Sequence, residues 1–382
     1  MGTISQRKNK DGVTRYRAEI RITKEGMPKF SESKTFSKKS LADAWIKKRE
    51  AEIELNPQLL HKSDVKSMRV SDAVAKYLAE TDGRFARTWV SNLKLIASTP
   101  FGAKYLDKLG RDDFMKFAHA RLNGTYPNLK PILPQTLTHD IVLIRALLTH
   151  AENVWGVAVK LDDFEKVVRG LKFARQIKHS DKRYRLPTNA ELQQLTNYFY
   201  RSFMRRDTGT PLHLLMWFAI ETARRQEEIC RLRLDDYHDG WWTVRNAKNP
   251  NGSHGNHKIF KVNATAQRIM QMLADTDLRD IQKRQFKAFN DRLLFSGKPK
   301  NLSARFTETC KILGIEDLHF HDLRHEAATR LAEQGLTIPQ IQQVTCHDSW
   351  SSLQRYVNNK KPRPTVLEFD EAMRVAKADF DG

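Results

Sequence analysis

Two histidines, an arginine and a tyrosine lie close together near the C-terminal end of the sequence. His321 and Arg324 are three residues apart, so both fall on one face of a helix that begins near Asp322. His347 follows a second predicted helix, and Tyr356 comes nine residues later. Guanidinium and imidazole groups stabilise the charge on a phosphodiester during transfer, and a tyrosine oxygen can hold the phosphate as a covalent ester. These residue types therefore suit phosphoryl transfer through a phosphotyrosyl intermediate.

The fragment His-x-x-Arg-His is a weak signal by itself, because a chain with 13 His and 66 Lys and Arg residues also produces it by chance. A second signal lies upstream, where the sequence TARRQEE of residues 222–228 follows an apolar helix predicted over 212–220. The two segments together resemble the tyrosine recombinases of the phage integrase family. The boxes of that family have the patterns T-G-x-R-x-x-E and H-x-L-R-H, followed by G-H and by a tyrosine nine residues later.

The resemblance implies a role for each matching residue. The tyrosine is the nucleophile, the histidine of the second box accepts its proton, and two arginines and the later histidine bind the non-bridging oxygens. An acidic residue orients the first arginine. In that order the residues are Tyr356, His321, Arg225, Arg324, His347 and Glu228, and His325 is a further candidate for supporting the pocket. Because the covalent ester conserves the bond energy, the resemblance implies neither ATP nor a metal nor any other cofactor.

The stretch between the two boxes predicts a hairpin that carries a lysine. Residues 241–244 and 259–262 have the composition of two strands. In the family that this chain resembles, a lysine on such a hairpin protonates the departing 5′ oxygen, which implies Lys248. Lys258 lies across the same hairpin and is the alternative.

Two positions depart from the pattern of the family. Ala223 and Cys346 both stand where the boxes have glycine. Because both side chains are small, we expect a local adjustment of the backbone and retained activity.

The composition favours a polyanionic partner. The 382 residues carry a formal net charge of +21, a bias that ribosomal, membrane-surface and DNA-binding proteins share. Three widely spaced cysteines without a CxxC pair argue against a disulfide framework or a zinc site and indicate a reducing compartment. The sequence shows no signal peptide and no apolar run of membrane-spanning length. These features predict a cytoplasmic protein with no membrane partner, and the resemblance to phage integrases implies the bacterial cytoplasm or nucleoid.

The first 55 residues predict a three-stranded sheet followed by a helix. Alternation over 13–23 places apolar side chains on one face and three arginines, Arg15, Arg17 and Arg21, on the other. An arginine row on an open sheet can lie in a DNA groove, and an ordinary solvated face is the alternative. The layout is similar to the arm-type DNA-binding domain that precedes the core of many phage integrases.

The whole chain predicts a multidomain α+β protein with the tyrosine recombinase fold. After the arm-type module of 1–55, a linker covers 56–68 and an all-α core-binding bundle of about four helices covers 69–170. A basic linker covers 171–187, and a mainly α catalytic domain with a small sheet covers 188–382. Residues of the basic linker that we expect to contact DNA phosphates are Lys172, Arg175, Lys178, Lys182 and Arg183.

The resemblance implies a site-specific recombinase that integrates and excises a phage or other mobile element. Its implied partners are double-stranded DNA attachment sites, further copies of the chain in a homotetramer, an excisionase and a host DNA-bending protein. A type IB topoisomerase, a resolvase and a DNA-binding regulator without catalysis are the alternatives. An amphipathic helix over 365–380 packs either on its own domain or on a neighbouring protomer.

Overall fold

The structure is a computed structural model that describes residues 2–8, 14–23, 30–55, 67–81, 85–181, 183–206, 208–248, 253–357 and 363–382. Most of the predicted linker over 56–68 and the predicted DNA contact Lys182 lie outside the described residues. The chain divides into two compact units, residues 1–181 and 182–382, and each is described by itself. In the described part, no helix combines the length and the apolar composition that crossing a bilayer requires.

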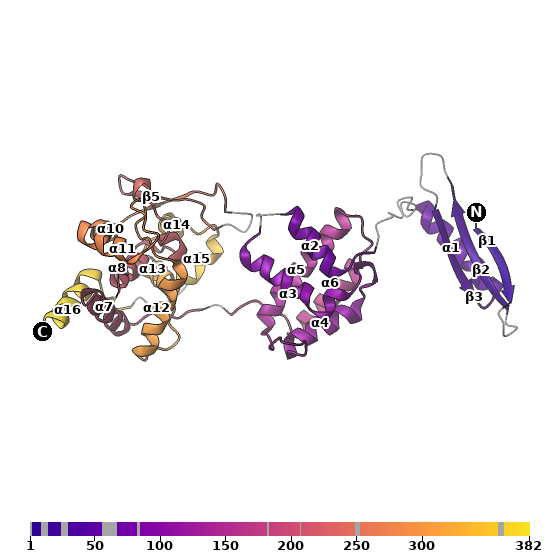
Figure 1. Ribbon diagram of the computed structural model, residues 1–382, viewed down its shortest axis with the longest axis horizontal. Coiled ribbons are helices and arrows are strands. Elements are labelled where there is room, and N and C mark those ends of the chain that lie inside the picture. The colour runs from indigo at the N-terminus through magenta and orange to yellow at the C-terminus, as the bar shows by residue number, and fades with distance from the viewer. Residues whose placement is uncertain are drawn as a thin grey trace. The chain divides into compact units, whose positions relative to one another are not determined.

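The N-terminal module is a three-stranded antiparallel sheet with one helix on it (Figure 1). Ala18 and Ile20 of the central strand are buried against the helix, whereas Arg15 and Arg21 of the same strand are exposed. The period-two alternation of this strand thus produced the predicted sheet and helix. The elements are β1 (Gly2–Lys8), β2 (Thr14–Ile22), β3 (Phe30–Phe36) and α1 (Lys39–Leu55).

The remainder of the first unit is a helical bundle around an aromatic core. Phe114 packs on Phe164 with ring centroids 5.0 Å apart, and Phe101 packs on Phe117 at 4.8 Å. The elements are α2 (Val70–Glu80), α3 (Arg87–Ser98), η2 (Pro100–Ala103), η3 (Leu106–Lys108), α4 (Arg111–Asn123), α5 (Pro134–Asn153) and α6 (Leu161–Phe173).

The bundle extends further along the chain than we predicted. Helix α6 was absent from the predicted set of four helices, although Phe164, Val167 and Leu171 have helical spacing and are buried. Ile177 is also buried in the same core. The segment that we placed in a basic linker from residue 171 therefore begins as part of the bundle, because these apolar side chains need a buried contact surface.

The second unit is built around α8 (Leu212–Thr222), which is apolar on all sides. Such a helix is stable only when it is covered all round, and α7 (Asn189–Met204), α10 (Ala264–Ala274) and α13 (Asp322–Glu333) pack on it. A small antiparallel sheet has the order β4-β5-β6. The other elements of this unit are α9 (Gln226–Ile229), η4 (Leu234–Asp236), β4 (Tyr237–His238), β5 (Trp241–Val244), β6 (Lys258–Lys261), α11 (Thr276–Gln285), α12 (Pro299–Ile312), α14 (Ile338–Thr345), α15 (Trp350–Val357) and α16 (Phe369–Asp381).

The C-terminal helix α16 packs on α7 of the same chain, and the two lie side by side in Figure 1. Phe369, Ala372 and Met373 join the apolar core of the unit. Arg201 of α7 also forms an ion pair with Asp379 at 2.6 Å. Of the two placements that we considered for this helix, the structure has the one on its own domain.

The segment between α15 and α16 is fastened to α13. Arg363 donates from Nη2 to Glu333 Oε2 at 2.8 Å and from Nη1 to Glu326 Oε2 at 2.9 Å. Glu326 has no exposed surface and also accepts a bond from Arg330 Nε at 2.7 Å. The chain that follows the tyrosine-bearing helix therefore returns to the same helix that carries the second box.

Candidate active site

The first box lies where α8 ends. Ala223 has a φ of 55°, in the left-handed region, and this turn ends the helix after Thr222. Arg225 then precedes the short helix α9, in which Glu228 accepts a hydrogen bond from the Arg225 backbone N–H at 3.1 Å and another from Nη1 at 2.8 Å. One carboxylate thus fixes both the main chain and the guanidinium of Arg225.

Arg324, on the first turn of α13, joins the first box to the later segments. Its side chain is buried and donates from Nη1 to the carbonyl of Ala223 at 2.5 Å. Its Nη2 lies 3.1 Å from Nε2 of His347. His321, one turn earlier, is exposed. Arg324 and His321 therefore lie at the same end of α13, with Arg324 buried and His321 accessible.

His347 follows a left-handed turn at the end of α14. Cys346 has a φ of 54° and directs the chain back toward α13, which places His347 beside Arg324. Nδ1 of His347 lies 2.8 Å from Thr345 Oγ1. Partial burial and the charge of Arg324 lower the pKa of His347 to about 3. The neutral ring can accept from Arg324 at Nε2 while its Nδ1–H donates to Thr345.

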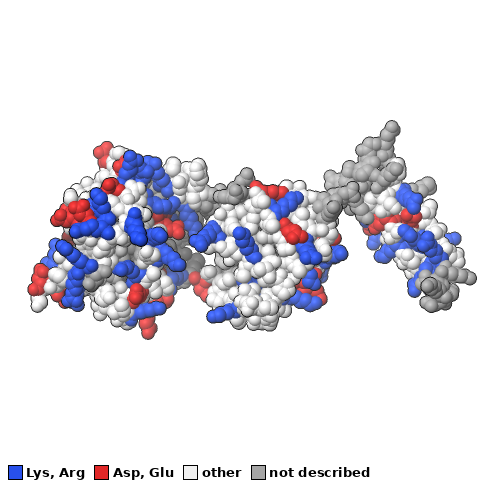
Figure 2. All heavy atoms as spheres, viewed as in Figure 1, with Lys and Arg blue, Asp and Glu red and all other residues white. Residues whose placement is uncertain are grey.

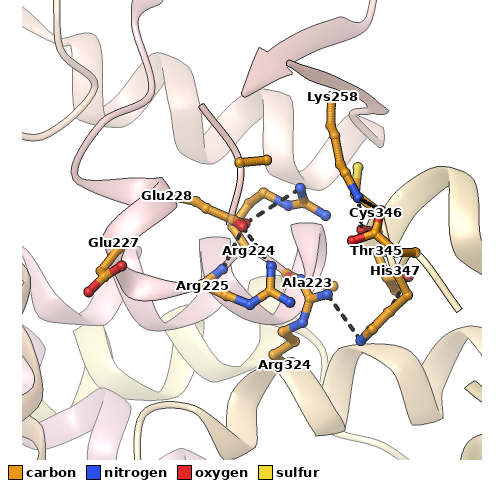
Figure 3. Close-up of polar contacts among 12 residues, drawn as sticks. Ala223, Arg224, Arg225, Glu227, Glu228, Lys258, Arg324, Thr345, Cys346 and His347 are labelled. Atoms are coloured by element: carbon orange, nitrogen blue, oxygen red, sulfur yellow. Dashed lines mark hydrogen bonds and ion pairs between the residues drawn. The ribbon is translucent and has the colours of Figure 1, made fainter. Parts of the chain in front are cut away.

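Three guanidinium groups lie near one carboxylate. Figure 3 shows Arg224, Arg225 and Arg324 around Glu228. Burial alone raises the pKa of Glu228, but these arginines outweigh it and lower the pKa to about 2. Burial and the other two arginines lower the pKa of Arg324 to about 9, so this group is still charged at neutral pH. The surplus of positive charge makes the cluster a site for an anion.

Tyr356 lies on α15, which packs on α13. Its hydroxyl is in hydrogen-bond contact with Nδ1 of His325. The ring of His325 stands perpendicular to that of His321, with centroids 5.2 Å apart. We expected His321 to accept the tyrosine proton, but the structure places His325 at the hydroxyl. The reason is that α15 lies over the later turn of α13, which the four-residue spacing of the two histidines does not reveal.

Lys248 follows β5 and is exposed. It lines a pocket together with Arg225 and His321, and the pocket wall is completed by Ser303 and Thr307 of α12. A lysine at this position reaches the same space as the accessible members of the cluster.

Lys258, the alternative to Lys248, has different surroundings. Its Nζ donates to the carbonyl of Cys346 at 3.1 Å and forms an ion pair with Asp348. The ammonium group therefore holds β6 against the turn that carries His347. Its position favours a structural role for Lys258 and leaves the pocket to Lys248.

Comparisons with known proteins match the part of the chain that contains this cluster of residues. The sequence model of the phage integrase family matches residues 188–363, which include all members of the cluster. The chain is also 28% identical over 302 residues to a protein of Escherichia coli named "Shufflon-specific DNA recombinase", with 77% of this chain and 70% of that protein covered. Residues 188–363 are thus a phage integrase family domain, which supports a tyrosine recombinase.

Solved structures have the same fold as this recombinase. A lambda integrase dimer bound to a COC′ core site matches with a TM-score of 0.54 and 15% identity, over 95% of this chain and 97% of that chain. The Tn1549 transposon integrase in complex with transposon right end DNA matches with a TM-score of 0.53 and 14% identity, over 81% of this chain and 99% of that chain. The tyrosine recombinase fold that we predicted is therefore confirmed.

The sequence analysis of the recombinase did not single out Arg224. This side chain is 1% exposed and lies between the first box and α14. Its only sequence signal is its position next to Arg225, and two adjacent arginines in a strongly basic chain are more easily taken for surface residues.

The predicted phosphate contacts of the recombinase fall into two groups. Lys172 and Arg175 are exposed, and Lys178 is exposed beside Asp181, with 2.9 Å between Nζ and the carboxylate. Arg183 is different, because it forms ion pairs with Asp317 at 2.8 Å and with the fully buried Asp322 at 2.7 Å. Our assignment of Arg183 to DNA contact is corrected, since its guanidinium is committed within the second unit.

Proposed function

We propose that this recombinase cuts and rejoins DNA at specific core sites through a 3′-phosphotyrosyl intermediate on Tyr356. The observation that carries the proposal is the position of the tyrosine hydroxyl. It contacts His325 on the helix whose first turn holds Arg324 within the cationic cluster. A nucleophile, a proton acceptor and an anion site are thus supplied by two packed helices and the first box.

The accessible arginine is the one that first meets the scissile phosphate. The Arg225 side chain is 32% exposed and lines the pocket with Lys248, whereas Arg324 is 2% exposed behind it. Arg225 therefore binds the non-bridging oxygens directly, and Arg324 adds charge and holds His347 at 3.1 Å. Fixed donors of this kind stabilise charge that develops in the transition state.

The reaction then balances with groups of this chain alone. The Tyr356 oxygen forms a bond to phosphorus and gives its proton to His325, while the bond from phosphorus to the 5′ oxygen breaks. Lys248 donates a proton to that departing oxygen. The products are a phosphotyrosyl ester at the 3′ end and a free 5′ hydroxyl. A 5′ hydroxyl of another strand reverses the step, and the ester retains the energy needed for rejoining.

We also propose the finer partners that the family resemblance implied. Double-stranded DNA sites suit the net charge of +21, and the lambda and Tn1549 proteins are bound to DNA in their structures. In the first module, Arg15 and Arg21 are exposed, and Figure 2 shows Lys and Arg side chains gathered on the visible face of that module. This supports arm-type binding. Assembly as a tetramer, an excisionase, a DNA-bending protein and a location in the cytoplasm complete the proposal.

Site-specific recombination is favoured over the alternatives that share its chemistry. The E. coli relative is named a DNA recombinase, and the two solved structures are integrases. The first box, the second box and the tyrosine are all present in one unit. A regulator without catalysis has no use for a tyrosine hydroxyl held against an imidazole.

Covalent capture tests the proposal. A duplex pool with a randomised core and a nick beside the cleavage position traps the intermediate, because the short strand diffuses away. We expect the wild-type chain to form an adduct that survives a denaturing gel, and Tyr356→Phe to form none. An adduct that persists in Tyr356→Phe, or no adduct from the wild type on any core, contradicts the assignment.

A further inference from the structure

Arg224 is a buried cation that has no part in the mechanism so far. Its side chain is 1% exposed, and its guanidinium lies over the face of Phe260, 4.3 Å from the ring centroid. Phe260 itself has no exposed surface. The pocket that Arg225 and Lys248 line also reaches Arg224. A charge kept out of water in this way needs several favourable contacts to offset its desolvation.

The contacts of Arg224 connect the ends of two helices. Nε donates to the carbonyl of Thr222, the last residue of α8, at 3.0 Å. Nη2 donates to the carbonyl of Val344, in the last turn of α14, at 2.5 Å. Carbonyl groups at helix C-termini lack partners within the helix, and positive charge is favourable there. One guanidinium therefore satisfies the helix end just before it and a second helix end at Val344, 120 residues after Arg224 in the sequence.

Each of these helix ends is followed at once by a member of the active site. Arg225 comes three residues after Thr222, and His347 comes three residues after Val344. Nη1 of Arg224 also forms an ion pair with Glu228 at 3.6 Å. Glu228 is the carboxylate that holds the main chain and the guanidinium of Arg225. A shift of Arg224 would therefore move both Arg225 and His347, which lie on the two sides of the proposed phosphate site.

We propose that Arg224 is a positioning residue for strand cleavage, which fixes Arg225 and His347 relative to one another by bridging the ends of α8 and α14. This role rests on the proposed phosphotyrosyl chemistry. We assign Arg224 a positioning role and not a phosphate contact, because Nε and Nη2 donate to the carbonyls of Thr222 and Val344, Nη1 pairs with Glu228, and the guanidinium lies on Phe260. Its removal should lower the rate of the chemical step without weakening the binding of DNA.

The test compares Arg224 with a matched buried arginine in the same unit. Arg330 is 7% exposed, pairs with Glu326 at 2.7 Å and lies over Trp217. Among the described residues it forms no hydrogen bond or ion pair with Arg225, Glu228, Arg324 or His347, and Glu326 keeps its bond from Arg363 when Arg330 is replaced. Arg224→Met and Arg330→Met each remove one buried guanidinium. Single-turnover adduct formation is measured on the core duplex selected by covalent capture, at a temperature where thermal melts show both variants folded. The Kd for the same duplex is measured in parallel.

We expect Arg224→Met to slow adduct formation at saturating DNA by roughly 100-fold while the Kd changes little, because misplaced catalytic groups lose their effective concentration. Arg330→Met should form the adduct at a rate close to that of the wild type. An Arg224→Met rate equal to that of Arg330→Met overturns the positioning role and leaves the proposed function standing. Absence of the adduct from the wild type and from Arg330→Met overturns the proposed function, and this role with it.

A second variant covers the case in which Arg224→Met does not fold. Arg224→Lys keeps the charge but offers a single ammonium that cannot donate to both carbonyls in the geometry of the guanidinium fork. We expect a cooperative melt and a cleavage rate about tenfold below that of the wild type, with an unchanged Kd. Cleavage by Arg224→Lys at the wild-type rate would show that charge alone is needed and would refute the bridge.

Discussion

Two residues with side chains occupy backbone positions that suit glycine. Ala223 and Cys346 have φ angles of 55° and 54°. The left-handed region costs an L-residue roughly 1 to 2 kcal/mol. Both residues stand at ends of helices that deliver catalytic groups, so the turns are retained although the glycines of the family boxes are not. The left-handed turns therefore form with a Cβ atom present, and the strain lies between each Cβ atom and the neighbouring backbone.

Replacing Cys346 with glycine should relieve this strain. We expect Cys346→Gly to raise the free energy of unfolding by about 0.5 to 1 kcal/mol, after the entropy cost of a glycine in the unfolded chain is included. Cys346→Ala, which keeps the Cβ atom, is the matched control and should bring no gain. Urea denaturation of the three proteins measures the difference. Equal stabilities for the glycine and alanine variants would mean that the left-handed turn carries no strain.

The roles of Lys248 and Lys258 can be distinguished by changing the leaving group of the DNA substrate. Lys248→Ala should slow cleavage by roughly 100-fold or more, because the 5′ alkoxide leaves poorly without a proton donor. A 5′-bridging phosphorothiolate, whose sulfur leaves without protonation, should restore the rate. Lys258→Ala should also slow cleavage, because the turn before His347 loses its contact at Cys346 O, but the sulfur substrate should not rescue it. If the sulfur substrate rescued Lys258→Ala and not Lys248→Ala, Lys258 would be the proton donor and Lys248 the structural residue.

The buried carboxylate of the first box should make stability depend on pH. The pKa of Glu228 is about 2 in the folded protein and is higher, near its ordinary value, in the unfolded chain. The stability from its ionised form is therefore complete above the unfolded pKa and is lost as pH falls through the folded pKa. We expect Glu228→Gln to lower the free energy of unfolding more at pH 6 than at pH 3, by a difference on the order of 2 to 3 kcal/mol. An equal loss at both pH values in urea titrations would contradict the shift.

Local patterns in the sequence correctly predicted individual strands and helices. Contacts between residues far apart in the sequence could not be predicted in this way. The alternation of Tyr16 to Ile22 was sufficient for the central strand, because period two is itself the geometry of a strand. The apolar run of α8 was sufficient for a buried helix. Both follow from neighbours in the sequence. The segment around Tyr356 forms helix α15.

Pairings between distant residues could not be predicted from one sequence. The partners of Arg183 lie 134 and 139 residues away, so its basic surroundings in the sequence suggested solvent and DNA instead. The contact between Tyr356 and His325 spans 31 residues and depends on how α15 packs on α13. The candidate catalytic residues could be proposed because the spacing within each box is local, whereas the residue that contacts the Tyr356 hydroxyl is determined by packing.

The role of the N-terminal sheet in DNA binding can be tested separately from the active site. If its exposed arginines bind separate arm sites, removal of residues 1–55 should abolish recombination between full attachment sites and leave cleavage of a short core duplex nearly unchanged. Arg15→Ala with Arg21→Ala should weaken binding of an arm duplex and lower the slope of log K against log salt by about 1 for each lost phosphate contact. Competition between arm and core duplexes measures both effects. If the truncated protein lost core cleavage as completely as recombination, the sheet would instead be needed for binding the core site.

For the whole molecule, the cis packing of α16 makes this helix part of the core of the second unit. Phe369 is 2% exposed, with its ring 6.0 Å from that of Trp217. We expect Phe369→Ala to lower the free energy of unfolding by about 3 to 5 kcal/mol. Arg374→Ala, on the exposed side of the same helix, should have little effect. A melt of Phe369→Ala that is unchanged from wild type would show that α16 contributes nothing to the fold of the single chain.

The chain is bonded to α13 both before and after the helix that carries Tyr356, and this affects how the proposed DNA linkage is held. Before α15, His347 is bonded to Arg324, and after it, Arg363 is bonded to Glu326 and Glu333; all three partners lie on α13. If Tyr356 carries the DNA as we propose, the ester lies on α15, and His347 before this helix and Arg363 after it both contact α13. In the proposed intermediate, a pull on the DNA would then be resisted by contacts on both sides of Tyr356, which would keep the severed strand close to α13 until it is rejoined.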